Sequence, residues 1–237
     1  FEKQNTIPLI DYLLPKNRTS YVHTSLASII INSIKTHPKA YHYISLKNLN
    51  HDIVNISAIL ATAQCTNTSI VLHQETTESN LDINRVAMYL QRSFPDTRIY
   101  TTHVIQSSDS IIQMLEDVVL RQNKANINLV CDRFFSESNT AYTKTNESYL
   151  AAAKTLLRGN SNIIFSNKCS DLFQNIHIPL SNKVVNCLPH SLSSQSILPN
   201  TNFETIQYLP TIIQPNNNPH KNGFTHWHKS PESHTYI

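Results

Sequence analysis

Apolar residues along most of this chain follow two alternating spacings, which predict helices that alternate with strands. Five segments place apolar residues at helical spacing, namely 20–36, 53–63, 80–94, 108–122 and 146–157. Short β-prone apolar runs fall between or after them, at 41–46, 69–73, 98–105, 127–131, 162–165 and 183–187. Strands that alternate with helices of about ten to fifteen residues imply right-handed crossovers and a mainly parallel sheet.

Residues at the ends of these segments support the boundaries. Asn50, Asn80 and Asn146 stand where a side chain can cap the first turn of a helix. Pro95 stops the third helical segment, and Gly159 follows the fifth, where a left-handed residue commonly ends a helix. Local capping chemistry therefore agrees with the apolar spacing.

The pattern predicts an α/β fold, a three-layer Rossmann-like sandwich whose sheet has about five or six mainly parallel strands. Residues 1–18 contain Pro8 and Pro15 and are expected to be irregular. Residues 1–188 are expected to form one domain that includes an N-terminal helical segment. Residues 189–237 are rich in Pro, Asn, Ser and His and predict an extended tail or linker, with a weak strand candidate at 205–209.

Composition narrows the class of protein. Of the 237 residues, 15% are charged and the net charge is +3, without a basic block, so nucleic acid is not an expected partner. No apolar run approaches the roughly 18 to 20 residues that span a bilayer, so no membrane association is expected. The four cysteines form no CxxC pair, which favours free thiols in a soluble protein of a reducing compartment, intracellular or delivered there.

Glycine scarcity excludes the common nucleotide-binding turns. The chain has two glycines, and the first strand-to-helix connection, SLKNLNHD, contains neither of them. Dinucleotide and Walker A loops need glycine where the backbone approaches phosphate. The sequence therefore identifies no cofactor, and any ligand is expected to be held by side chains and helix N-termini.

Topology selects the candidate binding residues, because ligands of open parallel sheets lie beyond the carboxyl ends of the strands. We predict a ligand-binding set at these ends. The set comprises Lys47, Asn48, His73, Glu75, Ser107, Ser108, Arg133 and Asn167.

Three further residues suggest covalent chemistry. Cys131 ends one predicted strand, His103 lies on the preceding strand, and Asp132 follows the thiol. A thiol beside an imidazole is the arrangement of a cysteine nucleophile. The succession of His103, Ser107, Ser108 and Cys131 resembles the caspase-like clan of cysteine peptidases. It lacks the Gly after the His and the Ala before the Cys that the clan carries. The alternative interpretation of Cys131 is a half-buried structural residue.

A metal site would draw on His73, Glu75, His103 and Asp132, but these residues show no local ligand signature, and no metal ligand is predicted. Two functions remain. The first is an enzyme of hydrolase or transferase type that acts on a small polar or phosphorylated ligand, such as a nucleotide or sugar nucleotide. The second is a non-catalytic protein-interaction or effector domain on a degenerate enzyme fold. A Cys–His hydrolase is a variant of the first.

Overall fold

The computed structural model describes nine stretches of the chain, and the statements below concern these residues. They are residues 7–13, 22–73, 80–105, 108–122, 125–131, 142–159, 162–166, 184–188 and 204–212. Within them the expected alternation is present, because strands and helices follow one another from β1 to α5.

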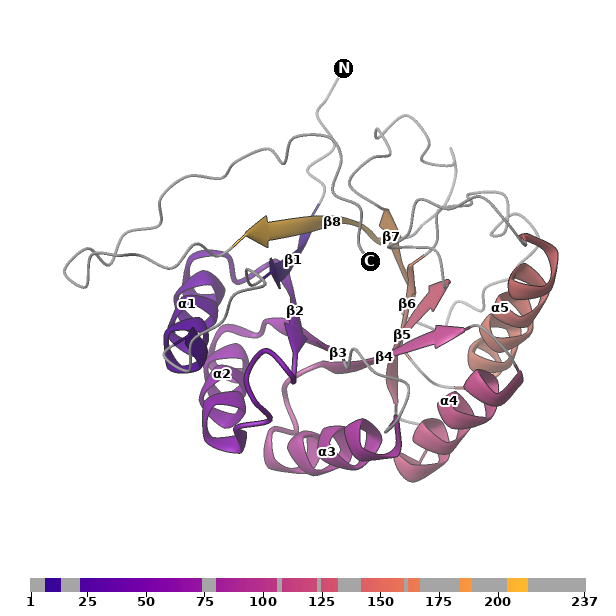
Figure 1. Cartoon of the computed structure of the whole chain (residues 1–237), viewed down its shortest axis with the longest axis horizontal. Helices are drawn as coiled ribbons and strands as arrows, with labels where there is room; N and C mark the ends of the chain where they lie inside the picture. Colours follow the sequence, from indigo (N-terminus) through magenta and orange to yellow (C-terminus); the bar gives the residue numbers. More distant parts are fainter. Residues whose placement is uncertain are drawn as a thin grey trace, which may run out of the picture.

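All eight described strands are parallel and lie side by side in chain order. They are β1 Ile7–Leu13, β2 Tyr41–Ser45, β3 Ser69–His73, β4 Ile99–Ile105, β5 Asn126–Cys131, β6 Asn162–Ser166, β7 Val184–Leu188 and β8 Glu204–Ile212. The sheet curls round on itself until β8 pairs with β1 over the full length of β1 (Figure 1). The result is a closed barrel.

The register of the strand pairs agrees with this closure. Leu9 lies opposite Tyr41, and Tyr41 lies opposite Ser69. Continued through β4 to β8, the register is offset by eight residues from its starting point when it reaches β1 again. A shear that equals the number of strands is the geometry of the (β/α)8 barrel, in which the strands tilt by about 36°.

Five described helices follow the first five strands and lie outside the barrel (Figure 1). They are α1 Val22–Thr36, α2 Ile53–Thr66, α3 Asn80–Ser93, α4 Ser108–Leu120 and α5 Tyr142–Leu157. Each returns the chain from the carboxyl end of one parallel strand to the amino end of the next, which a two-residue hairpin cannot do.

The sheet has two buried faces. Two hydrophobic clusters combine strand residues with helix residues, so they fill the layer between the barrel and the helices. A third cluster draws residues from all eight strands and from no helix, so it fills the barrel interior. Because side chains alternate along a strand, each strand contributes to both faces.

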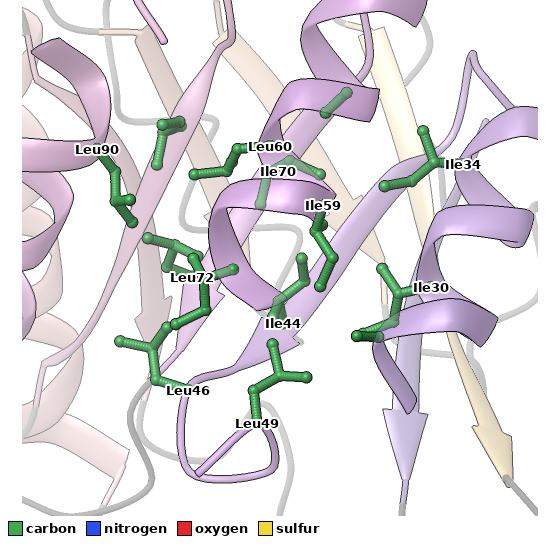
Figure 2. Packing of buried hydrophobic residues seen from close by; sticks show 14 of the residues in the cluster. Ile30, Ile34, Ile44, Leu46, Leu49, Ile59, Leu60, Ile70, Leu72 and Leu90 are labelled. Carbon is green, nitrogen blue, oxygen red and sulfur yellow. The ribbon is translucent and has the colours of Figure 1, made fainter. Parts of the chain in front are cut away.

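The outer layer is best seen between α1, α2 and the first strands. Ile30 and Ile34 of α1 and Ile59 and Leu60 of α2 pack with strand residues such as Ile44 (Figure 2). Burying one such side chain contributes roughly 1.5–3 kcal/mol. The apolar stripes seen in the sequence are the surfaces that hold the helices to the barrel.

The expected alternation of helices with a parallel sheet is confirmed, but the three-layer sandwich is wrong. The described helices cover the outer face alone, and the inner face closes on itself. The sheet has eight strands rather than five or six, because β1 lies where residues 1–18 suggested irregular chain. The strand candidate at 205–209 lies within β8, so the sheet extends into the segment expected to be a tail.

Two helix starts differ from the expected caps. Asp52 is the N-cap of α2, and its carboxylate accepts from the backbone N–H groups of Val54 and Asn55. Asn50 instead lies in the preceding turn with φ of 53°, and His51 follows with φ of 54°. Helix α5 begins at Tyr142, one turn before Asn146. No helix in the described part of the chain is long and apolar enough to cross a membrane.

Candidate functional site

The carboxyl ends of the barrel strands are the place where (β/α)8 enzymes build their sites. Because side chains alternate along a strand, every second residue counted from a member of the inner cluster also points into the barrel. On β8, β1, β2 and β3 they include Tyr208, Asp11, Tyr43 and His73. We call these four residues the Asp11 wall.

Asp11 and Tyr208 are joined directly. The Tyr208 hydroxyl donates a hydrogen bond to Oδ2 of Asp11, across the β1–β8 seam that closes the barrel. Asp11 is 7% exposed, and Tyr208 is half-buried. This bond orients the carboxylate, because a hydrogen bond to an ionised group is strong and the tyrosine that donates it is held on its strand.

Tyr43 and His73 form the other half of the wall. Asp11 lies opposite Tyr43 in the register of β1 and β2, which places the two side chains next to each other. The rings of Tyr43 and His73 stack, with centroids 5.2 Å apart and planes 28° apart. His73 is half-buried at the last position of β3, next to Ser45 at the end of β2. The wall thus carries a carboxylate, an imidazole and two phenols over four adjacent strands.

On β4, β5 and β6, uncharged polar side chains lie among the apolar residues of the inner face. Asn128 donates from Nδ2 to Oγ1 of Thr102 at 3.1 Å, and Ser166 donates from Oγ to Oδ1 of Asn128 at 2.8 Å. On β7, burial raises the pKa of the Cys187 thiol to about 12 despite its hydrogen bond with Ser166. The thiol is therefore protonated at neutral pH and is a poor nucleophile.

Two predicted ligand-binding residues follow β2. Asn48 is buried, and its Nδ2 donates to the backbone carbonyl of Tyr12 at 3.4 Å. Its backbone N–H donates to Oγ of Ser45 at 3.3 Å. The first bond attaches the loop after β2 to β1, and the second attaches it to the end of β2, so Asn48 helps to position this loop. Lys47 beside it is exposed.

His103 lies on the outer face of β4 and faces α4. Its Nε2 donates to Oδ2 of Asp117 at 3.0 Å. Arg121 donates to the same carboxylate through Nε at 2.9 Å and Nη2 at 2.5 Å, and the Thr101 hydroxyl donates to it at 2.5 Å. Burial alone raises the pKa of Asp117, but the His103 hydrogen bond and the Arg121 charge lower it to about 2. The carboxylate is therefore ionised in the layer between strand and helix.

Cys131 also faces the helices. It is buried in the outer cluster with Met114 of α4 and Tyr149 of α5. His103 and Cys131 thus lie on the outer face of the sheet, behind the strands that separate them from the barrel interior. Strand alternation explains this placement, because both residues share the outward phase of β4 and β5.

Several predicted residues lie outside the described part of the chain. These are Glu75, Ser107, Asp132, Arg133 and Asn167, and the side chain of Ser108 at the start of α4. Two of the four residues considered for a metal site lie on opposite faces of the sheet, because His73 faces the barrel interior and His103 faces α4. Among the described residues, no group of three or more His, Cys, Asp or Glu side chains is placed to hold a metal ion.

Sequence reasoning found His73 but missed Asp11, Tyr43 and Tyr208. A signal was present, because Asp11 is a single charged residue inside an apolar run, IPLIDYL. Pro8 in that run favoured irregular chain over a strand. Comparison with known proteins finds no family model that matches the chain and no curated protein that matches it in sequence.

Proposed function

We propose that this protein is an enzyme of hydrolase or transferase type, which acts on a small polar ligand at the carboxyl end of its barrel. The observation that carries the proposal is the Asp11 wall, defined above. Groups that exchange protons, placed together at a strand end, are the usual requirement for general acid–base catalysis.

The wall suggests a role for each residue. Asp11, oriented by the Tyr208 hydroxyl, serves as the proton acceptor. His73, held by stacking on Tyr43, serves as the proton donor from the neighbouring strands. Side chains on strands are held more firmly than side chains on loops, which favours a site that depends on angle and distance.

The test is a ligand screen that reads binding and turnover separately. Nucleotides, sugar nucleotides, sugars, amines and divalent metal ions are offered to the purified chain while its melting temperature is recorded. A hit is then assayed for hydrolysis or group transfer. We expect Asp11→Asn and His73→Gln to lower the rate by about 100-fold or more while the fold is kept. Asp96→Asn is the matched control, since Asp96 is an exposed carboxylate in the turn before β4.

Two outcomes would redirect the proposal. Loss of turnover in Cys131→Ala, with full turnover in Asp11→Asn, would favour the Cys–His hydrolase. No hit in the whole screen would favour the non-catalytic interaction domain. For that alternative, the relevant observation is a row of exposed apolar side chains on α4, namely Ile112, Val119 and Leu120.

A further inference from the structure

The charge of the barrel interior restricts the ligand that the proposed site takes. Among inward-facing residues whose side chains are described, Asp11 is the one carboxylate, and neither Lys nor Arg is present. Phosphate sites on proteins rely on Arg, Lys or helix N-termini that face the anion. The charge that the described inward-facing side chains supply is therefore negative, which favours a cation over an anion.

Two tyrosines lie next to the same carboxylate. Tyr43 and Tyr208 flank Asp11 on the adjacent strands, and His73 stacks on Tyr43. Deeper in the barrel, Tyr41 and Tyr100 approach each other with ring centroids 6.1 Å apart and planes tilted by 56°. Four tyrosines therefore belong to one inner cluster. Phenol faces attract ammonium groups within about 6 Å of the ring centroid, and quaternary ammonium ligands are bound by such surroundings.

We propose that the ligand of the Asp11 wall is an organic cation, a protonated amine or a quaternary ammonium group. Asp11 supplies the opposite charge, and the faces of Tyr43 and Tyr208 supply the cation–π contacts. The inference rests on the proposed function for its location but not for its chemistry, because a cation can bind whether or not the protein turns it over.

The carboxylate of Asp11 and the phenol rings beside it have different roles in this proposal. The Tyr208 hydroxyl holds Asp11, so the Tyr208 ring lies next to the carboxylate. A carboxylate alone also binds inorganic cations, whereas flanking phenol faces favour cations with an apolar surface. Inorganic sodium or potassium is therefore expected to compete weakly.

The experiment measures binding to the full chain by NMR titration, with tetramethylammonium and 1,4-diaminobutane as cations and with inorganic phosphate and glucose as an anion and a neutral polyol. We expect the cations to perturb resonances of β1, β2 and β8 and to bind at least tenfold more tightly than phosphate or glucose. Asp11→Asn, which keeps an acceptor for the Tyr208 hydroxyl, should weaken the cations by about tenfold or more. Tyr43→Phe should bind as the parent does, and Tyr43→Leu should bind about threefold to thirtyfold more weakly.

Each outcome decides between the two proposals. Phosphate or glucose binding at the wall, with cations excluded, would overturn the cation inference and keep the proposed site. Cation binding that Asp11→Asn leaves unchanged would overturn the inference as well. Cation binding at the wall without turnover of any ligand would support the inference and overturn the enzyme. Asp96→Asn controls for the loss of one surface charge, and melting temperatures establish that each variant is folded.

Discussion

At the scale of single residues, we expect the buried histidine of β2 to make the stability of the protein depend on pH in mild acid. His42 is fully buried on the outer face of β2, where its Nδ1 accepts from the Tyr12 hydroxyl at 2.6 Å. Its Nε2 donates to the backbone carbonyl of His37 at 3.4 Å. Both bonds suit the neutral imidazole. Burial lowers the pKa of His42 to about 4, against 6.5 for a free side chain, while the carbonyl bond opposes the shift.

This shift predicts a loss of stability between pH 6.5 and 4. In that window the unfolded chain binds a proton at His42 that the folded chain does not, so stability falls as pH falls. The full effect is on the order of 3 kcal/mol. We expect His42→Asn, which retains an acceptor for Tyr12, to remove much of this slope at a modest cost in stability at pH 7. Urea unfolding at pH 7, 5.5 and 4.5 measures it.

The matched control is His51→Asn, because His51 is exposed and an asparagine tolerates its positive φ. Its slope should equal that of the parent. Equal slopes for the parent and His42→Asn would show that His42 is not the group that titrates.

At the scale of elements, helices and strands were predicted well because the apolar spacing that identifies each one lies within its own segment of sequence. Apolar spacing located α1 to α4 within a few residues, and the six strands from β2 to β7 coincide with the predicted runs. Strand β1 was missed, and β8 was predicted only as a weak candidate at 205–209; they contain Pro8 and Pro210, which weaken a strand pattern. The two strands pair with each other from opposite ends of the described chain, so no local sequence pattern indicates this pairing.

The site was harder to predict than the elements. The strands of this barrel are buried on both faces, so segments such as IVL in β3 show no alternation that separates inward from outward residues. His103 and Cys131 therefore fit the predicted site as well as His73 does, although they face the helices. Which residues of a strand face the barrel interior is set by the register with the neighbouring strands and not by the composition of the strand.

The Asp117 network attaches α4 to β4 and β5 and carries a prediction of its own. Arg121 also donates to the backbone carbonyls of Ile99 and Asn126, both at 3.3 Å, so its guanidinium joins the helix end to two strands. Asp117→Asn leaves that guanidinium buried without its counter-charge. We expect a loss of about 3–5 kcal/mol in the free energy of unfolding, measured by urea denaturation at pH 7.

Two comparisons test this explanation. Glu116→Gln removes an exposed carboxylate one residue away and should change stability by less than about 0.5 kcal/mol. The double variant Asp117→Leu with Arg121→Met should be more stable than Asp117→Asn, because apolar residues of similar size need no counter-charge. A double variant less stable than the single one would show that the network itself holds α4 in place.

At the scale of the whole molecule, closure by β8 decides whether the sheet has edges. Strand β8 pairs with both β1 and β7. Without it, two strands would present unpaired backbone groups, which promotes association between chains. We expect a chain that ends at residue 203 to be unfolded or aggregated, and a chain that ends at Ile212 to melt cooperatively near the parent temperature. Circular dichroism and light scattering measure both, and a stable monomer ending at residue 203 would contradict the closed barrel.

The hydrogen bond between Tyr208 and Asp11 joins positions 197 residues apart in the chain. Contacts of such long sequence separation form late in folding, because the entropy of closing the loop must first be overcome. We therefore expect the Asp11 wall to be complete only after β8 has closed the barrel, and a chain that ends before β8 lacks Tyr208. A ligand that binds this wall binds the closed barrel and not its precursors, so its presence shifts the folding equilibrium toward the complete molecule.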